Sequence, residues 1–230
     1  MGIGPFFACH FIIKRGESPA GRFTCGRKQG KITVNGRVQK AVLHAAGRAV
    51  PMRQNARRRT GRGSSMRRNA CCFTGHRPGK LPWGCHEQDL RCLHLKKRIA
   101  DAVETAYEQG FRHFLCGMAQ GCDLYFCECV LELRERLPGV TVEAAIPCPT
   151  QANAWPPDQR ARYQALVTRC DYETLVSARY TPSCMQRRDR YMVDHASLLI
   201  AAFDGSAGGT RYTVEYAMRQ KISIVDLPIL

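Results

Sequence analysis

Residues 198–210, LLIAAFDGSAGGT, carry the clearest signal of fold class in this sequence. Their first six residues, Leu198–Phe203, are apolar without alternation, which is typical of a strand that is covered on both faces. The glycines and hydroxyl groups that follow open a helix at Gly208, Gly209 and Thr210. A buried strand that passes through a glycine-rich turn into a helix is the building unit of α/β folds with a parallel sheet.

The same alternation extends outward from this stretch over most of the chain. We expect strands at residues 70–73, 111–116, 140–146, 172–177, 198–203 and 222–225, separated by helices that begin near residues 89, 122, 158, 183 and 209. Parallel neighbours need long crossovers, so this order predicts a Rossmann-like, three-layer α/β domain with a mostly parallel sheet. The expected domain spans residues 66–230 and follows a basic, low-order extension, residues 1–65.

The positive charge of the chain is concentrated in that extension. Residues 1–65 hold 14 Lys and Arg against one acidic residue, a net charge of +13, whereas the whole chain has +16. The remaining residues carry 21 basic and 18 acidic side chains, a net charge of +3. A strongly positive net charge favours nucleic-acid binding. The net charge of +3 for residues 66–230 is too small to support such binding by this part of the protein.

Four interpretations of residues 1–65 stay open. Met66-Arg67-Arg68-Asn69 directly precedes an apolar strand and resembles a natural protein start. We therefore favour the interpretation that residues 1–65 are upstream sequence translated in error. An inert, solvated arm is our second choice. A nucleic-acid-binding arm and an organelle transit peptide are the other two, because the segment is rich in arginine and poor in acids.

Cysteine usage and hydropathy indicate a cytoplasmic protein. The 13 cysteines are an odd number scattered over strand-like and helix-like segments, and no secretory signal precedes them, so we expect reduced thiols. No apolar run approaches the roughly 20 residues of a membrane span, and we expect no membrane partner. No C-x-x-C pair is present, so we expect no metal site. We also expect no cofactor. No histidine can be identified from the sequence as the base that would activate a cysteine nucleophile.

The first candidate ligand loop is TGHRP, residues 74–78, which follows the first expected strand of the body. Gly75 permits close approach of the backbone, Arg77 offers a planar donor fork for phosphate or carboxylate, and His76 can donate a hydrogen bond. A tight turn with a solvated histidine and arginine explains the same residues equally well.

The second candidate loop is GMAQGCD, residues 117–123, between a strand and a helix. Its glycines would leave backbone N–H groups at the positive end of the helix, which suits an anion. Asp123 could hold a ribose hydroxyl, although an acid in the first turn also simply complements the helix dipole. The spacing is not that of the G-x-G-x-x-G dinucleotide motif.

The third candidate loop is residues 204–210, and a charged helix precedes its strand. On that helix Arg187, Arg190, Tyr191 and Asp194 share one face, which could contact a phosphate and a base or could be solvated. Ligands of open α/β sheets bind beyond the carboxyl ends of the strands, where the strand order reverses. We therefore expect the three loops to converge on one crevice.

The ordered set of motifs is more specific than any single loop. TGHRP, GMAQGCD, EAAIPCPTQANAW at 143–155 and the stretch 180–217 together resemble the YpsA-like family of the SLOG superfamily, over about residues 66–228. The resemblance implies a Rossmann-like fold and binding of nucleotides or nucleotide-derived ligands, as in its relatives DprA and the LOG phosphoribohydrolases. The implied ligand-loop positions are Thr74, Gly75, His76, Arg77, Gly117, Gly121, Asp123, Arg187, Arg190, Asp194, Gly208, Gly209 and Thr210.

The chain departs from the LOG signature P-G-G-x-G-T-x-x-E, because AGGTRYTVE lacks the proline and the spacing, and Glu215 cannot simply inherit a catalytic role. The candidate acids and bases, His76, Asp123, Asp194 and Glu215, do not pair by spacing. We expect a sensor or regulatory module that binds a nucleotide-type small molecule. A nucleotide N-glycosidase is the alternative, DprA-like nucleic-acid binding is the second alternative, and the chain could form a homodimer.

Overall fold

The computed structural model describes residues 11–14, 31–34, 37–40 and 69–229. The chain divides into two units, one made of residues 1–15 and 61–230 and the other of residues 16–60. In the second unit, β2 (Lys31–Val34) and β3 (Arg37–Lys40) pair as an antiparallel hairpin. The expectations of a natural start at Met66 and of a low-order extension fall largely outside the described residues.

The first unit contains a seven-stranded sheet with the order β1-β7-β6-β5-β4-β8-β9. Six strands are parallel: β4 (Ala70–Gly75), β5 (His113–Cys116), β6 (Thr141–Ile146), β7 (Tyr172–Leu175), β8 (Leu198–Phe203) and β9 (Ser223–Pro228). All six lie at the positions that the apolar runs predict, and the Rossmann-like fold is confirmed.

The seventh strand comes from the segment that was not expected to contribute to the sheet. β1 (Phe11–Lys14) pairs antiparallel with β7, with Phe11 opposite Leu175 and Lys14 opposite Tyr172. A sheet edge exposes unpaired N–H and C=O groups that any extended segment can satisfy. The sequence FIIK is apolar enough to form a strand, but its four residues are too short to show a period.

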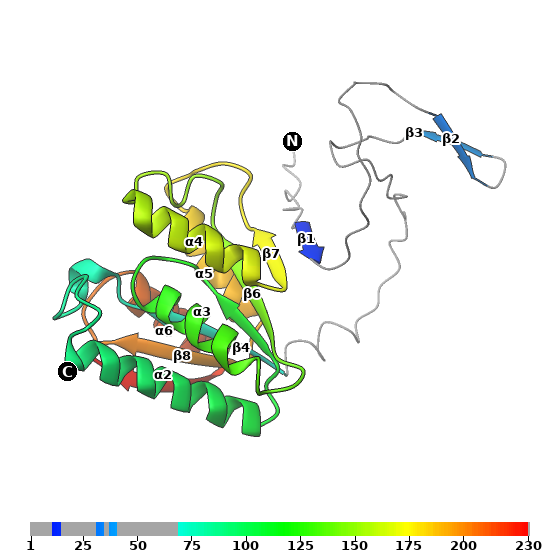
Figure 1. Ribbon diagram of the computed structural model, residues 1–230. Coiled ribbons are helices and arrows are strands. Elements are labelled where there is room, and N and C mark those ends of the chain that lie inside the picture. The colour runs from blue at the N-terminus through cyan, green and yellow to red at the C-terminus, as the bar shows by residue number, and fades with distance from the viewer. Residues whose placement is uncertain (1–10, 15–30, 35–36, 41–68, 230) are drawn as a thin grey trace. The chain divides into compact units, whose positions relative to one another are not determined.

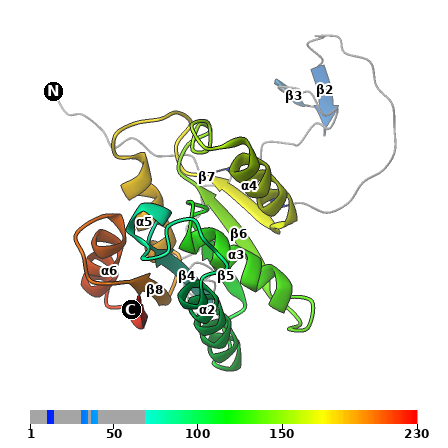
Figure 2. The same ribbon diagram turned by 60° about the vertical axis from the view of Figure 1, so that its left-hand side comes forward.

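Five α-helices cover the two faces of the sheet (Figures 1 and 2). They are α2 (Leu90–Glu108), α3 (Cys122–Leu133), α4 (Pro157–Arg169), α5 (Cys184–Asp194) and α6 (Gly209–Gln220). The first three pack on one face and the last two on the other, so two cores form. Alternate residues of β4 enter different cores: Cys71 and Phe73 lie in one, and Ala70 and Cys72 in the other. This explains why the strands read as continuous apolar runs.

A buried polar network joins three strands of the sheet to α5. Glu143 is only 5% exposed, and its carboxylate accepts hydrogen bonds from His113 Nε2 at 2.9 Å, Thr174 Oγ1 at 2.7 Å and Tyr191 Oη at 2.7 Å. Burial acts to raise the pKa of Glu143, but the three hydrogen bonds hold the pKa below its usual value. The network therefore keeps a charge in the core by satisfying it.

The strand order reverses between β4 and β8. The chain proceeds from β4 through β5 and β6 to β7 on one side, and then returns to place β8 and β9 on the other side of β4. In open α/β sheets, ligands bind beyond the carboxyl ends of the strands at such a reversal of strand order. Among the described residues, no helix is long and apolar enough to cross a membrane.

Candidate ligand-binding site

The loops after β4 and β8 meet at the point of reversal. His76, 2% exposed, follows β4, and its Nε2 lies 2.6 Å from Oδ1 of Asp204, which follows β8. The hydrogen bond with His76 and a second one from the backbone N–H of Ser206 hold the pKa of the Asp204 carboxyl well below its usual range. The two loops are thus joined by a charge-assisted hydrogen bond.

Two further contacts bring the N-terminus of α6 to the same place. Thr210 Oγ1 donates to the carbonyl oxygen of Gly75 at 3.1 Å. Lys80, at the end of the 3-10 helix η1 (Pro78–Lys80), donates from Nζ to Ser206 Oγ at 3.2 Å and to the carbonyl oxygen of Ala207. An ammonium group therefore lies beside the positive end of a helix, an arrangement that favours a bound anion.

The turn before α6 is open above its glycines. A Cβ atom added to Gly209 would meet nothing within 4 Å, and one added to Gly208 would lie 2.9 Å from Lys80 Nζ. Backbone N–H groups in the first turn of a helix have no partner within the helix. The expected anion cradle at residues 208–210 therefore has open space beside Gly209 and a cation beside Gly208.

Gly121 of the GMAQGCD loop permits close packing against the loop that follows β4. Gly121 has φ +86°, and a Cβ there would lie 2.7 Å from the carbonyl oxygen of His76. That same carbonyl accepts the backbone N–H of Cys122 at 3.1 Å, and a Cβ on Gly75 would lie 2.4 Å from Cys122 Cβ. The loop that follows β4 and contains His76 and Arg77 (the β4 loop) thus packs directly on the N-terminus of α3. The carbonyl oxygen of His76 occupies part of the position expected for an anion there.

Asp123 lies beneath this loop. It is 5% exposed, and its Oδ2 accepts the backbone N–H of Ala119 at 3.2 Å and lies 3.8 Å from Nη1 of Arg188. Burial raises the pKa of Asp123 to about 6, against the lowering effect of Arg188. The carboxylate therefore fixes the loop conformation and has little surface with which to reach a ribose.

Arg188 is a buried cation next to the GMAQGCD loop that the sequence analysis does not single out. Its side chain, 4% exposed, donates from Nε to Asp189 Oδ1 at 2.7 Å and from Nη1 to the carbonyl oxygen of Gly117. A Cβ on Gly117 would lie 2.0 Å from that Nη1, so only glycine admits the guanidinium. A signal was present: Arg188 is four residues after Cys184 and three before Tyr191, on the buried stripe of α5.

The other charged residues expected at the site have protein partners of their own. Arg190 Nε donates to Tyr212 Oη at 2.5 Å, and Asp194 accepts from Tyr216 Oη at 2.9 Å, so both bind α6. Glu215 pairs with Arg211 at 2.9 Å on the exposed face of α6. Arg187 is exposed and its Nη2 bonds Thr181 Oγ1. Arg190 therefore lies beside the first turn of α6, whereas the partners of Arg187, Asp194 and Glu215 are residues outside the three loops.

A small pocket of about 40 Å³ opens beside the β4 loop, lined by Arg77, Ala119, Gln120, Gln151, Trp155 and Met185. It collects residues that follow β4, β5 and β6, together with one residue of α5. Arg77 is exposed, and the Nε2 group of Gln151 donates to the carbonyl oxygens of Met118 and, at 3.4 Å, Gly117. Sequence reasoning missed Gln151 and Trp155, although both lie in the segment PCPTQANAW that carries part of the family resemblance.

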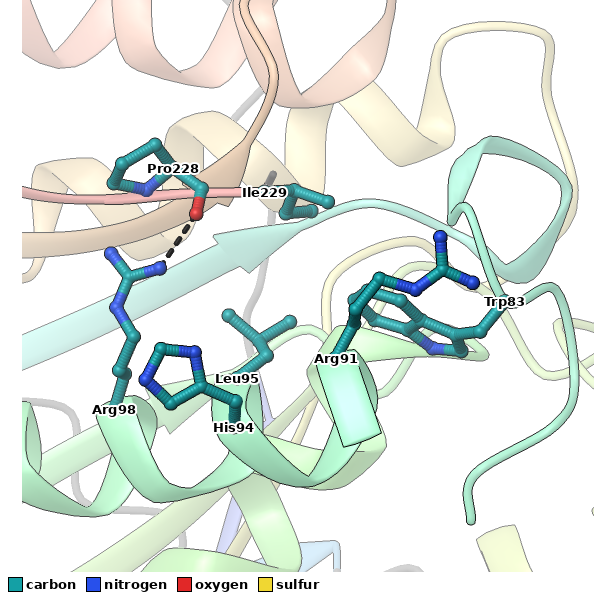
Figure 3. A pocket seen from close by; sticks show the side chains of 7 residues that line it. All are labelled: Trp83, Arg91, His94, Leu95, Arg98, Pro228 and Ile229. Carbon is teal, nitrogen blue, oxygen red and sulfur yellow. Dashed lines mark hydrogen bonds between the residues drawn. The ribbon is translucent and has the colours of Figure 1, made fainter. Parts of the chain in front are cut away.

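A second pocket of about 50 Å³ lies between α2 and the end of β9 (Figure 3). Arg98 Nη1 donates to the carbonyl oxygen of Pro228 at 2.6 Å, and Arg91 is held by a bidentate pair with Asp89. Both cations therefore already have protein partners. Among the described residues, no group of three or more His, Cys, Asp and Glu side chains is placed to hold a metal ion.

Comparison with curated proteins finds relatives whose function is not stated in their names. The chain is 29% identical over 140 residues to the uncharacterized SPbeta prophage-derived protein YoqJ of Bacillus subtilis. The matched region covers 55% of this chain and 82% of YoqJ. It is 25% identical over 141 residues to YpsA of the same organism, covering 60% of this chain and 77% of YpsA.

Solved structures of similar fold include two DNA processing proteins. DprA of Helicobacter pylori, described in a single-stranded DNA binding mode, has a TM-score of 0.50 and 13% identity over 73% of this chain and 68% of that one. DprA of Streptococcus pneumoniae has a TM-score of 0.50 and 16% identity over 71% of this chain and 51% of that one. The family model described as "YspA SLOG family" matches residues 71–227. The chain therefore belongs to the YpsA family of SLOG proteins.

Proposed function

We propose that this protein binds a nucleotide or nucleotide-derived ligand at the carboxyl ends of β4, β5 and β8 and acts as a sensor or regulatory module. The observation that carries the proposal is the N-terminus of α6, with open space beside Gly209 and Lys80 next to Gly208, at the reversal of strand order. A phosphate there would accept hydrogen bonds from the backbone N–H groups of Gly209 and Thr210 and would be attracted by the ammonium group of Lys80. Membership of the SLOG superfamily is consistent with such a ligand.

Hydrolysis of an N-glycosidic bond is less well supported by the side chains at the rim. Such a reaction needs a carboxylate that attacks or stabilises the sugar and a second group that protonates the base or activates water. Asp123 is buried under its loop, while Asp194 and Glu215 bind partners on α6 and its outer face. Asp204, which the sequence analysis does not include among the candidate acids, lies at the end of β8, where it is engaged by His76.

Single-stranded DNA is a second candidate, because a structure of similar fold is described with it. Arg77 and Lys80 are exposed on the same loop and could contact successive phosphates. Phosphate contacts of this kind would give an affinity that falls steeply with salt. A mononucleotide, in contrast, needs one anion site and a base site and would depend less on salt.

Isothermal titration of the full chain with AMP, CMP, ADP-ribose and cyclic dinucleotides tests the proposal. We expect saturable binding of at least one of them, and a loss of about tenfold or more for Lys80→Ala, because hydrogen bonds to charged groups contribute about 1.5–3 kcal/mol. Lys97→Ala is the matched control, since Lys97 is exposed on α2 and its removal changes the net charge equally.

Three outcomes distinguish the candidates. Equal loss of affinity in Lys80→Ala and Lys97→Ala would show that binding follows net charge and not the α6 site. Tight, salt-sensitive binding of an oligonucleotide without binding of any mononucleotide would favour DNA. Release of free base during incubation, followed by chromatography, would replace the sensor by the hydrolase.

A further inference from the structure

Gln151, which lines the pocket beside the β4 loop, carries a buried hydrogen-bond acceptor without a partner among the described residues. Gln151 Oε1 is buried, and no donor lies within hydrogen-bond distance of it among the described residues. The other end of the amide is fixed, because Nε2 faces the carbonyl oxygens of Met118 and Gly117. Rotating the amide by 180° would bring Oε1 against these two carbonyl oxygens. The side chain therefore presents an acceptor and cannot exchange it for a donor.

The walls of the same pocket suit the edge of a flat ring. Trp155 is half-buried and packs edge-to-face on Tyr163, with ring centroids 5.4 Å apart and planes at 77°. That contact holds the indole in one orientation, and its rings are the one aromatic surface among the pocket residues. Met185, on the α5 side, is unbranched and partly buried, so it can move aside for a ligand.

The size of the pocket limits what can enter. A volume of about 40 Å³ admits a few water-sized groups and excludes a whole nucleotide. An exocyclic amino group, with the ring edge that bears it, matches both this volume and the need of Gln151 for a donor. Arg77, which also lines the pocket, is an exposed cation that could contact the sugar side of the same ligand.

We propose that Gln151 selects nucleobases with an exocyclic amino group, its Oε1 accepting an N–H of that group while the ring lies against Trp155. The inference rests on the proposed function and names the class of base that the site takes. Because the amide is locked, a base with a carbonyl oxygen or a hydrogen atom at that position is not matched by rotation of the side chain.

A pair of ligands that differ only in the amino group tests the inference. The full chain is titrated with AMP and with purine riboside 5′-monophosphate, in which hydrogen replaces the amino group, and with CMP and its 4-deamino analogue. We expect the amino-bearing member of at least one pair to bind about tenfold or more tightly, since its absence leaves a buried acceptor unpaired.

The variant Gln151→Met keeps the side-chain length and removes the acceptor, so it should bind both members of the pair equally. Gln164→Met, on the exposed face of α4, should keep the discrimination. Equal affinities within both pairs for the unmodified protein would overturn the role of Gln151 and leave the proposed function intact, and that comparison needs no variant. Binding of no nucleotide at all would overturn both. Discrimination that persists in folded Gln151→Met would assign it to another residue.

Discussion

Replacing Asp123 by asparagine should change how the stability of the protein depends on pH. The carboxyl group is buried and its pKa is raised from the usual 3.8 to about 6. A group that binds its proton more tightly in the folded state stabilises that state at low pH, and the contribution is lost as the pH rises through the two values. The full difference corresponds to about 3 kcal/mol, of which about 1.4 kcal/mol falls between pH 5 and pH 7.5.

Asparagine retains an oxygen that accepts the N–H of Ala119 and has no proton to lose in this range. The free energy of unfolding of Asp123→Asn minus that of the unmodified protein should therefore increase by about 1.4 kcal/mol from pH 5 to pH 7.5. Urea denaturation at the two pH values measures this difference, and Asp101→Asn, at an exposed position on α2, serves as the control. A difference that stays constant or falls with pH would refute the reasoning, because the pKa of Asp123 would then not be raised.

Three other substitutions test the packing under the loops and the polar network. Gly117→Ala should lower the free energy of unfolding by about 3 kcal/mol or more, because the new Cβ would displace the buried Arg188 guanidinium. Gly79→Ala, which adds its Cβ in open space, should change that free energy by less than about 0.5 kcal/mol, and chemical denaturation measures both values. Arg188→Met should cost about 3–5 kcal/mol by leaving buried carboxylates unpaired, whereas the exposed Arg169→Met should be nearly neutral, and equal effects would contradict the ion cluster. Glu143→Leu should lower the free energy of unfolding by about 3 kcal/mol at pH 7, and the thermal midpoint with it, because three donors lose their acceptor; an unchanged midpoint would argue against the network.

The sequence predicted the fold well because each buried strand of the body is followed by a turn and an amphipathic helix. Leu198–Phe203 shows this most clearly, since a strand covered on both faces has no alternation to misinterpret. β1 was not expected, because a four-residue edge strand depends on the unpaired edge of β7 and not on a pattern of its own.

The candidate site was predictable in its location and less so in its residues. Strand ends and glycines identify the loops, but a glycine needed for close packing, such as Gly121, has the same appearance in sequence as one that cradles an anion. The same ambiguity affects charge: Arg190 was assigned to a ligand face by helical spacing, yet tyrosines of α6 bind it. Gln151 was overlooked because only the fold shows that its amide oxygen lacks a partner.

Backbone amide chemical shifts measured by NMR during titration with AMP locate the ligand without any substitution. If the phosphate lies on α6 beside Lys80, the largest changes will occur at residues 208–211 and in the 77–80 segment of the β4 loop, with smaller ones near Gln151. Changes confined to α2 around His94 and to the end of β9, where the other pocket lies, would contradict a ligand site at the reversal of strand order.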